Sequence, residues 1–240
     1  MTDELDLGLA EIFAHQDDAL SRNFQASQFV QAFSSVLSRS IRVNFSILRG
    51  IKFDAAKQTA VRLFAVDTLS HIAVSARVGL WGALPESLSV LRSGIESCAQ
   101  LAYMVSKQLY QTAISEVNSR RFQQLEFREA CRGLGPEGAA FAEHHGRISN
   151  LASHSTSRRI KLSEYQIDGE AYDRLGFALD AENAELVTGQ CVELSQSVAF
   201  SLRAAYLQDR APFHWDADLQ NILQTHEALK SQFKTKHEQT

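Results

Sequence analysis

The chain has 240 residues, of which 45% are hydrophobic and 22% are charged, and its formal net charge is −4. This composition is that of an average globular protein and excludes a disordered or fibrous chain. The slightly acidic balance gives no overall footprint for wrapping duplex DNA or coating an anionic membrane, so any polyanion site has to be local. Only 3 prolines and 12 glycines punctuate the chain, which favours long helices over a sandwich or barrel.

Apolar residues recur at helical spacing through most of the chain and predict an all-α bundle of about seven or eight helices, several of them long. A first helix is expected at about 4–21, a second at 27–50 and a third at 54–80. Pro85 opens a fourth helix at its first turn, where a missing N–H costs nothing. The rest of the chain is expected to form a fifth, Arg-rich helix at 109–131, a sixth at 136–153, a loop at 155–168 with a short extended piece at 159–162, a seventh helix at 170–208 and a last helix at 216–233.

The domain organisation is expected to be simple, because no internal repeat or low-complexity linker divides the chain. A single helical domain is predicted over 1–240, with a core at about 54–208 on which the helices at 4–50 and 216–233 pack. No apolar run approaches the roughly 20 residues of a membrane span, and the acidic start does not resemble a signal peptide, so a cytoplasmic protein without membrane contact is expected.

An arginine and a histidine, Arg147 and His154, stand seven residues apart near the end of the expected sixth helix. Seven steps of about 100° fall about 20° short of two turns, so both would share one face, with Asn150 between them. An imidazole can move a proton to or from a ribose hydroxyl, and a guanidinium can bind a phosphate with two hydrogen bonds. The alternative interpretation is a polar helix face that contacts only water.

Two further groups of residues bear on this hypothesis. The basic residues Arg158, Arg159 and Lys161 would add local positive charge for RNA binding. Arg92 and Glu96, four apart on the fourth helix, can form an ion pair that orients neighbouring helices. In a functional role, Glu96 would orient the histidine or Arg92 would join the phosphate site, and both roles require the fourth and sixth helices to touch.

Other candidate sites are weaker. Asp67 and His71 could supply two metal ligands, but a hydrogen bond at the edge of the core is the expected outcome. Metal-binding helix motifs and glycine-rich phosphate loops are absent, so neither a metal nor a cofactor is expected. The three cysteines show no ligand spacing and are expected to be buried thiols. Arginines and glutamates interleave on the expected fifth helix, which indicates a solvated face: Arg120, Arg121, Arg128 and Arg132 with Glu116, Glu126 and Glu129.

Arg147, the six residues after it and His154 fit the R-x4–6-H signature of the HEPN superfamily, helical bundles that include metal-independent endoribonucleases. The segments Leu91-Arg92-Ser93-Gly94-Ile95-Glu96 and Ser149-Asn150-Leu151-Ala152-Ser153-His154-Ser155 also resemble motifs of bacterial HEPN-like proteins, over about 60–205. The resemblance implies a HEPN-like core, a homodimer, His154 as the proton-transfer group and Arg147 as the phosphate clamp. Asn150 is the third catalytic candidate.

The leading interpretation is therefore a HEPN-like endoribonuclease that cleaves RNA by attack of the 2′-hydroxyl, in a toxin–antitoxin or phage-defence setting with an antitoxin or another protein partner. The alternative is a non-catalytic helical module that binds RNA, a small ligand or a protein. A third interpretation, a ligand-sensing regulator, would need a DNA-reading helix-turn-helix, and none is identifiable in the first 50 residues.

Overall fold

A computed structural model describes residues 20–25, 27–152, 164–167, 170–173 and 181–238. Within these ranges nearly all residues are helical, which confirms the all-α class. The helices that follow a short helical segment at 20–25 are α2 (Gln28–Gly50), α3 (Ala55–Leu80), α4 (Leu84–Lys107), α5 (Tyr110–Ser119), α6 (Phe127–Leu134), α7 (Pro136–Ala152), α9 (Ala181–Gln208) and α10 (Asp216–Glu238).

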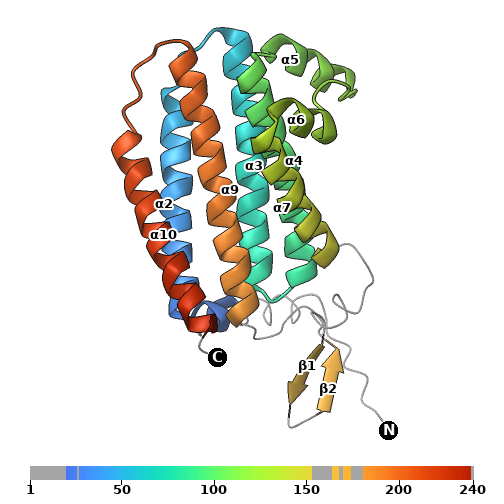
Figure 1. Ribbon diagram of the computed structural model, residues 1–240, viewed down its shortest axis with the longest axis vertical. Coiled ribbons are helices and arrows are strands. Elements are labelled where there is room, and N and C mark those ends of the chain that lie inside the picture. The colour runs from blue at the N-terminus through green and yellow to red at the C-terminus, as the bar shows by residue number, and fades with distance from the viewer. Residues whose placement is uncertain (1–19, 26, 153–163, 168–169, 174–180, 239–240) are drawn as a thin grey trace.

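Four long helices, α2, α3, α4 and α9, run side by side along the length of the molecule (Figure 1). Helix α9 touches the other three, and α3 lies against α4. Helix α10 covers α2 and part of α9 at one edge, while α6 and α7 cover α4 at the other edge. This order leaves α4 between the bundle and α7, where the residues of the candidate site meet.

The core is continuous through the four long helices. Each fully buried Leu or Ile stabilises the fold by about 1.5–3 kcal/mol through removal of apolar surface from water. Helix α2 supplies several of these side chains, so it is an integral member of the bundle. Representative buried residues are Val30, Phe33 and Ile47 of α2, Leu69 and Ile72 of α3, Leu91 and Ile95 of α4, and Leu194 and Leu202 of α9.

The helix starts follow the sequence signals closely. The side chain of Ser27 accepts hydrogen bonds from the backbone N–H groups at the start of α2, and Asp54 does the same for α3. Pro85 stands in the first turn of α4, as predicted. Helix α7 begins at Pro136 and ends at Ala152, close to the predicted 136–153.

The predicted continuous helix at 109–131 is wrong, because it is two helices joined by a loop. Helix α5 ends at Ser119, and Arg120 takes a left-handed conformation with φ 55°. The buried carboxylate of Glu116 then accepts hydrogen bonds from the backbone N–H groups of Gln124 at 2.7 Å and Leu125 at 3.1 Å. A carboxylate that binds loop amides in this way stabilises the loop against continued helix.

The predicted start of the seventh helix at 170 is also wrong. Residues Glu170–Asp173 form strand β2, which pairs antiparallel with β1 (Glu164–Ile167), and α9 begins only at Ala181. The pairing places Ile167 opposite Glu170 and Glu164 opposite Asp173. The predicted extended piece at 159–162 and the first predicted helix up to residue 19 lie outside the described residues.

Helix α3 is the one described helix that is long and apolar enough, by length and composition, to cross a membrane. It packs against α4 and α9 in the bundle, and 44% of its most apolar window is buried there. Its buried side chains include Phe64, Leu69 and Ile72, which belong to the core. The packing of the bundle therefore accounts for the apolar character of α3.

Candidate functional site at the α4 and α7 interface

Helices α4 and α7 pack against each other, which was the condition for any joint role of their polar residues. The imidazole Nε2 of His145 on α7 lies 2.7 Å from Oε1 of Glu96 on α4. The guanidinium Nε of Arg92, one turn before Glu96, lies 3.7 Å from the same oxygen. The expected Arg92–Glu96 ion pair is thus confirmed, and it is extended by a histidine that the sequence reasoning missed.

His145 is held on a second side by an aromatic ring. Its imidazole lies against Phe127 at the start of α6, with ring centroids 4.5 Å apart and planes inclined by 35°. The side chain keeps 22% of its surface exposed. A carboxylate at one ring nitrogen and a phenyl ring against the face orient the imidazole and leave part of the side chain exposed.

Arg147 lies on the other flank of α7. It stands two positions after His145, which is about 200° around a helix, and the buried side chain of Ile148 fills the seam between them. Arg147 and Asn150 are both exposed. The structure therefore groups Arg92 and Glu96 with His145. Arg147 of the same chain lies on another face of α7 and is not part of this group.

The remaining predicted site residues are His154, Arg158, Arg159 and Lys161, and they lie outside the described residues. Helix α7 ends at Ala152, two residues before His154. The histidine that the described residues present to the Glu96 carboxylate is His145, one turn before Ser149 of the resembling segment. The signal that could have revealed it is the His144-His145 pair, since adjacent residues on a helix point to different neighbours.

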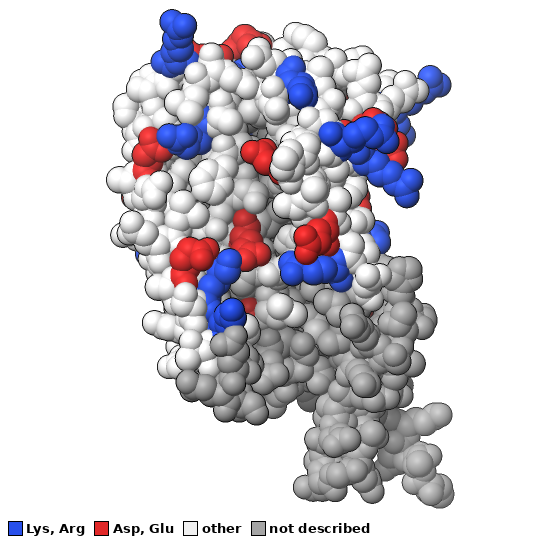
Figure 2. All heavy atoms as spheres, viewed as in Figure 1, with Lys and Arg blue, Asp and Glu red and all other residues white. Residues whose placement is uncertain are grey.

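A groove of about 690 Å³ runs between α4, α7 and α9 on the Arg147 side. Its walls include Phe141 and Phe200, and its polar lining includes Glu137, His144 and Glu193. Acidic side chains are visible along the middle of this face in Figure 2. No lysine or arginine lines the groove among the described residues, so its charge does not suit a phosphate.

His144 lines this groove in its neutral form. Burial lowers the pKa of its imidazole, Arg147 lowers it further, and Glu193 opposes both effects. Its Nε2 is buried and has no hydrogen-bond partner among the described residues. His144 is thus a neutral imidazole in the groove wall, whereas His145 is the histidine oriented by a carboxylate.

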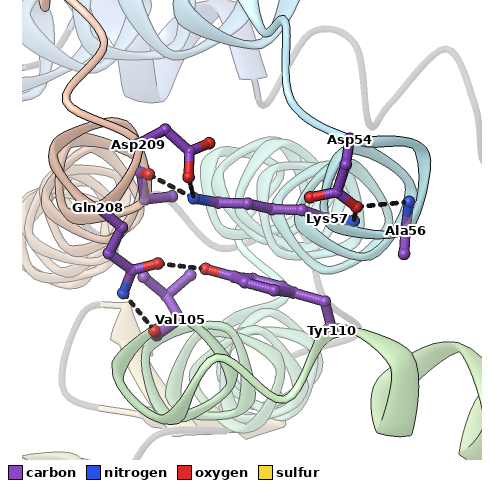
Figure 3. A network of polar contacts seen from close by, with 8 residues as sticks. Asp54, Ala56, Lys57, Val105, Tyr110, Gln208 and Asp209 are labelled. Carbon is purple, nitrogen blue, oxygen red and sulfur yellow. Dashed lines mark hydrogen bonds and ion pairs between the residues drawn. The ribbon is translucent and has the colours of Figure 1, made fainter.

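A partly buried polar network joins the ends of several helices (Figure 3). The ammonium of Lys57 donates to the carbonyl of Ala205 at 2.7 Å and to Asp209 at 2.9 Å. The hydroxyl of Tyr110 donates to Gln208 at 2.5 Å. Burial and the nearby Asp209 raise the pKa of Tyr110, so its hydroxyl stays protonated. This network joins α3 and α5 to the end of α9 and acts as a structural clamp.

The structure agrees with what the sequence predicts for Asp67 and His71 and for the three cysteines. The ring Nδ1 of His71 lies 2.9 Å from the backbone oxygen of Asp67, the hydrogen bond expected at the edge of the core. Cys98, Cys131 and Cys191 are buried free thiols, and burial raises the pKa of each. Within the described part of the chain, no three His, Cys, Asp or Glu side chains gather as a metal site would require.

Comparison of the chain with protein-family models, with curated proteins and with solved structures finds no match.

Proposed function

We propose that the chain is a HEPN-like, metal-independent endoribonuclease that acts in the cytoplasm as a homodimer, in a toxin or phage-defence setting. The observation that carries the proposal is the Glu96–His145 hydrogen bond of 2.7 Å with Arg92 beside it. A carboxylate-oriented imidazole next to a guanidinium supplies a proton-transfer group and a phosphate-binding group, the two kinds of side chain that RNA cleavage without a metal needs.

The proposed reaction is an internal transfer of the RNA phosphate. A histidine takes the proton of the 2′-hydroxyl, the 2′-oxygen bonds to the adjacent phosphorus, and the bond to the 5′-oxygen breaks. A second group returns a proton to the leaving 5′-oxygen. The products are a 2′,3′-cyclic phosphate and a 5′-hydroxyl. Guanidinium groups stabilise the charge that develops on the phosphate oxygens.

His145 and His154 are the two proton-transfer groups in this proposal, the first from the contacts described above and the second from the resemblance. Arg92 lies beside His145 on the same chain. Arg147 points to the other flank of α7, so it reaches a His145 site only from a second copy of the chain. A homodimer of the kind that the resemblance implies would supply that copy.

Incubation of the purified protein with single-stranded RNA in EDTA tests the proposal. Wild-type protein is expected to cleave the RNA, and His145→Ala and His154→Ala are expected to lose about 10²- to 10⁴-fold in rate. His214→Ala is the matched control, because His214 is exposed and lies away from α4 and α7. The proposal is wrong if wild-type protein leaves the RNA intact, or if both histidine variants cleave as fast as the control.

A second candidate function, ligand binding without catalysis, is favoured by the 690 Å³ groove between α4, α7 and α9. Its volume lies within the range of about 300–1,000 Å³ that is typical of small-molecule sites. Aromatic walls at Phe141 and Phe200 with carboxylates at Glu137 and Glu193 suit an organic cation with an apolar body.

Calorimetric titration with phenethylamine, and with phenylacetate of similar size, tests this second function. Ligand binding in the groove predicts heat with the amine only, and loss of that heat in a Ser197→Trp variant, in which an indole fills the groove. If phenethylamine and phenylacetate give the same heat of binding, the groove does not select an organic cation and the second candidate function is wrong.

A further inference from the structure

A separate pocket of about 300 Å³ lies between α3, α4 and the loop that joins α5 to α6. Its lining combines apolar side chains, two of which are aromatic rings, with an acid, a hydroxyl and an amide. Aromatic rings together with hydrogen-bonding groups are the chemistry of a site for a planar heterocycle. The residues used below are the apolar Phe64, Val117 and Phe122 and the polar Asp67, Ser97 and Gln100.

The pocket is close to the Glu96–His145 pair. Gln100 follows Glu96 by four residues on α4, which is about 6 Å along the helix axis and about 40° around it. The two side chains therefore lie on neighbouring turns of the same half-exposed strip of α4. The pocket therefore lies about one helical turn from Glu96, the partner of His145.

The carboxylate of Asp67 is held in a defined orientation. The hydroxyl of Ser97 donates to its Oδ2 at 2.5 Å, and Nδ1 of His71 lies 3.5 Å from the same oxygen. The Ser97 hydroxyl occupies one lone pair of Oδ2, so Oδ1 and the second lone pair of Oδ2 can each accept a hydrogen bond from a ligand. The side chain of Asp67 is 49% exposed and lines the pocket, so its carboxylate can be reached by a ligand.

Phe122 is an exposed aromatic ring on a fixed loop. Its side chain is 45% exposed, although the loop itself is anchored by the buried Glu116 and by Leu125. Arg120 and Arg121 directly precede it and are exposed. Basic side chains, with acidic ones among them, gather along the edge of the molecule formed by α5 and α6 in Figure 2. An exposed ring beside arginines is a typical surface for stacking a base and binding its phosphates.

We propose that this pocket binds a guanine base of single-stranded RNA, an inference that rests on RNA being the substrate of the neighbouring site. Guanine offers two adjacent donors, N1–H and the N2 amino group, to the carboxylate of Asp67. The amide of Gln100 can donate to O6, and Phe122 stacks on the ring. Adenine and the pyrimidines do not offer two adjacent donors on that edge, so a carboxylate reader selects guanine.

Binding of oligouridines with 2′-deoxy substitutions, which block cleavage, tests the pocket with the full-length chain. Two ten-nucleotide probes differ only in a central guanine or adenine, and affinity is measured by fluorescence anisotropy. The guanine probe is expected to bind about tenfold more tightly. Asp67→Asn is expected to abolish this preference, while Glu126→Gln, an exposed acid on the same loop, keeps it. Phe122→Ala weakens binding of both probes by about tenfold.

Equal affinity for the two probes, or a guanine preference that survives in Asp67→Asn, overturns the inference. Melting temperatures of the variants, compared with wild-type protein, show whether each is folded. Since the probes cannot be cleaved, the outcome is independent of catalysis. If the protein binds the guanine probe selectively but cleaves no RNA, the guanine pocket is supported and the nuclease proposal is wrong. If the protein cleaves RNA but binds both probes equally, the nuclease proposal is supported and the guanine pocket is wrong.

Discussion

The imidazole of His145 and the carboxylate of Glu96 lie 2.7 Å apart across the interface of α7 and α4, two helices far apart in the sequence. Replacing Glu96 with Gln keeps the size of the side chain but removes the charge that orients the ring. Cleavage of RNA is expected to fall about 10- to 100-fold in kcat with little change in KM, because the proton-transfer imidazole of His145 loses the carboxylate that orients it while no substrate-binding group is removed. Glu96→Asp is expected to recover part of kcat. A change in KM alone would contradict this role.

Because His145 and Arg147 lie on different flanks of α7, we expect each active site to combine residues from two copies of the chain. Mixing inactive His145→Ala with inactive Arg147→Ala is expected to restore about a quarter of wild-type activity, since half of the dimers are mixed and each mixed dimer keeps one intact site. The measurement is RNA cleavage after subunit exchange. If both residues acted within one chain, every site in the mixture would be damaged, and no activity would return.

Two glycines of α7 give opposite predictions for the same substitution. A Cβ on Gly138 would come within 1.8 Å of the backbone oxygen of Cys131, so Gly138→Ala has to push α6 away from α7. Its free energy of unfolding is expected to fall by about 3 kcal/mol or more, and the contact of Phe127 with His145 is expected to loosen. A Cβ added to Gly146 would meet no atom within 4 Å, so Gly146→Ala is expected to stabilise the protein by about 0.5–1 kcal/mol. Urea denaturation measures both, and similar effects at the two positions would contradict the close packing of α6 on α7.

Buried neutral histidines predict sensitivity to mild acid. Burial lowers the pKa of His226, which is almost fully buried between α10 and α9; Lys230 lowers it further, and Glu193 and Glu227 oppose this. Because the unfolded chain takes up a proton more readily than the folded one, stability is lost as the pH falls through the ordinary histidine pKa of about 6.5. The melting temperature is expected to drop between pH 7.5 and 5.5, and to drop less in His226→Gln. If the melting temperature of His226→Gln falls with pH as steeply as that of wild-type protein, His226 is not the source of the acid sensitivity.

The parts of the fold that the sequence predicts are those fixed by local signals. Ser27, Asp54 and Pro85 mark helix starts because a cap or a proline acts within a few residues of itself. The break after Ser119 could not be predicted in this way, because it depends on a buried glutamate that binds amides eight and nine residues later. Helical periodicity does not register such a contact.

The candidate site shows the same division. The spacing of Arg92 and Glu96 predicts their ion pair, since both stand on one helix. The partner that completes the site, His145, is 49 residues beyond Glu96 and is selected by how α6 and α7 pack on α4. Rotation of α7 by one residue would have presented His144 to Glu96 instead, and that rotation is set by the burial of Ile148, which a pattern of polar residues does not reveal.

Cleavage of RNA by 2′-hydroxyl attack, with His145 held by Glu96, is the central proposal for this helical bundle. Its most direct test is mass spectrometry of the products from one defined single-stranded RNA, incubated in EDTA with wild-type protein and with His145→Ala. We predict fragments ending in a 2′,3′-cyclic phosphate, matched by fragments with a 5′-hydroxyl, from wild-type protein alone. Intact RNA, or the same fragments in equal amounts from the His145→Ala variant, would contradict the proposal.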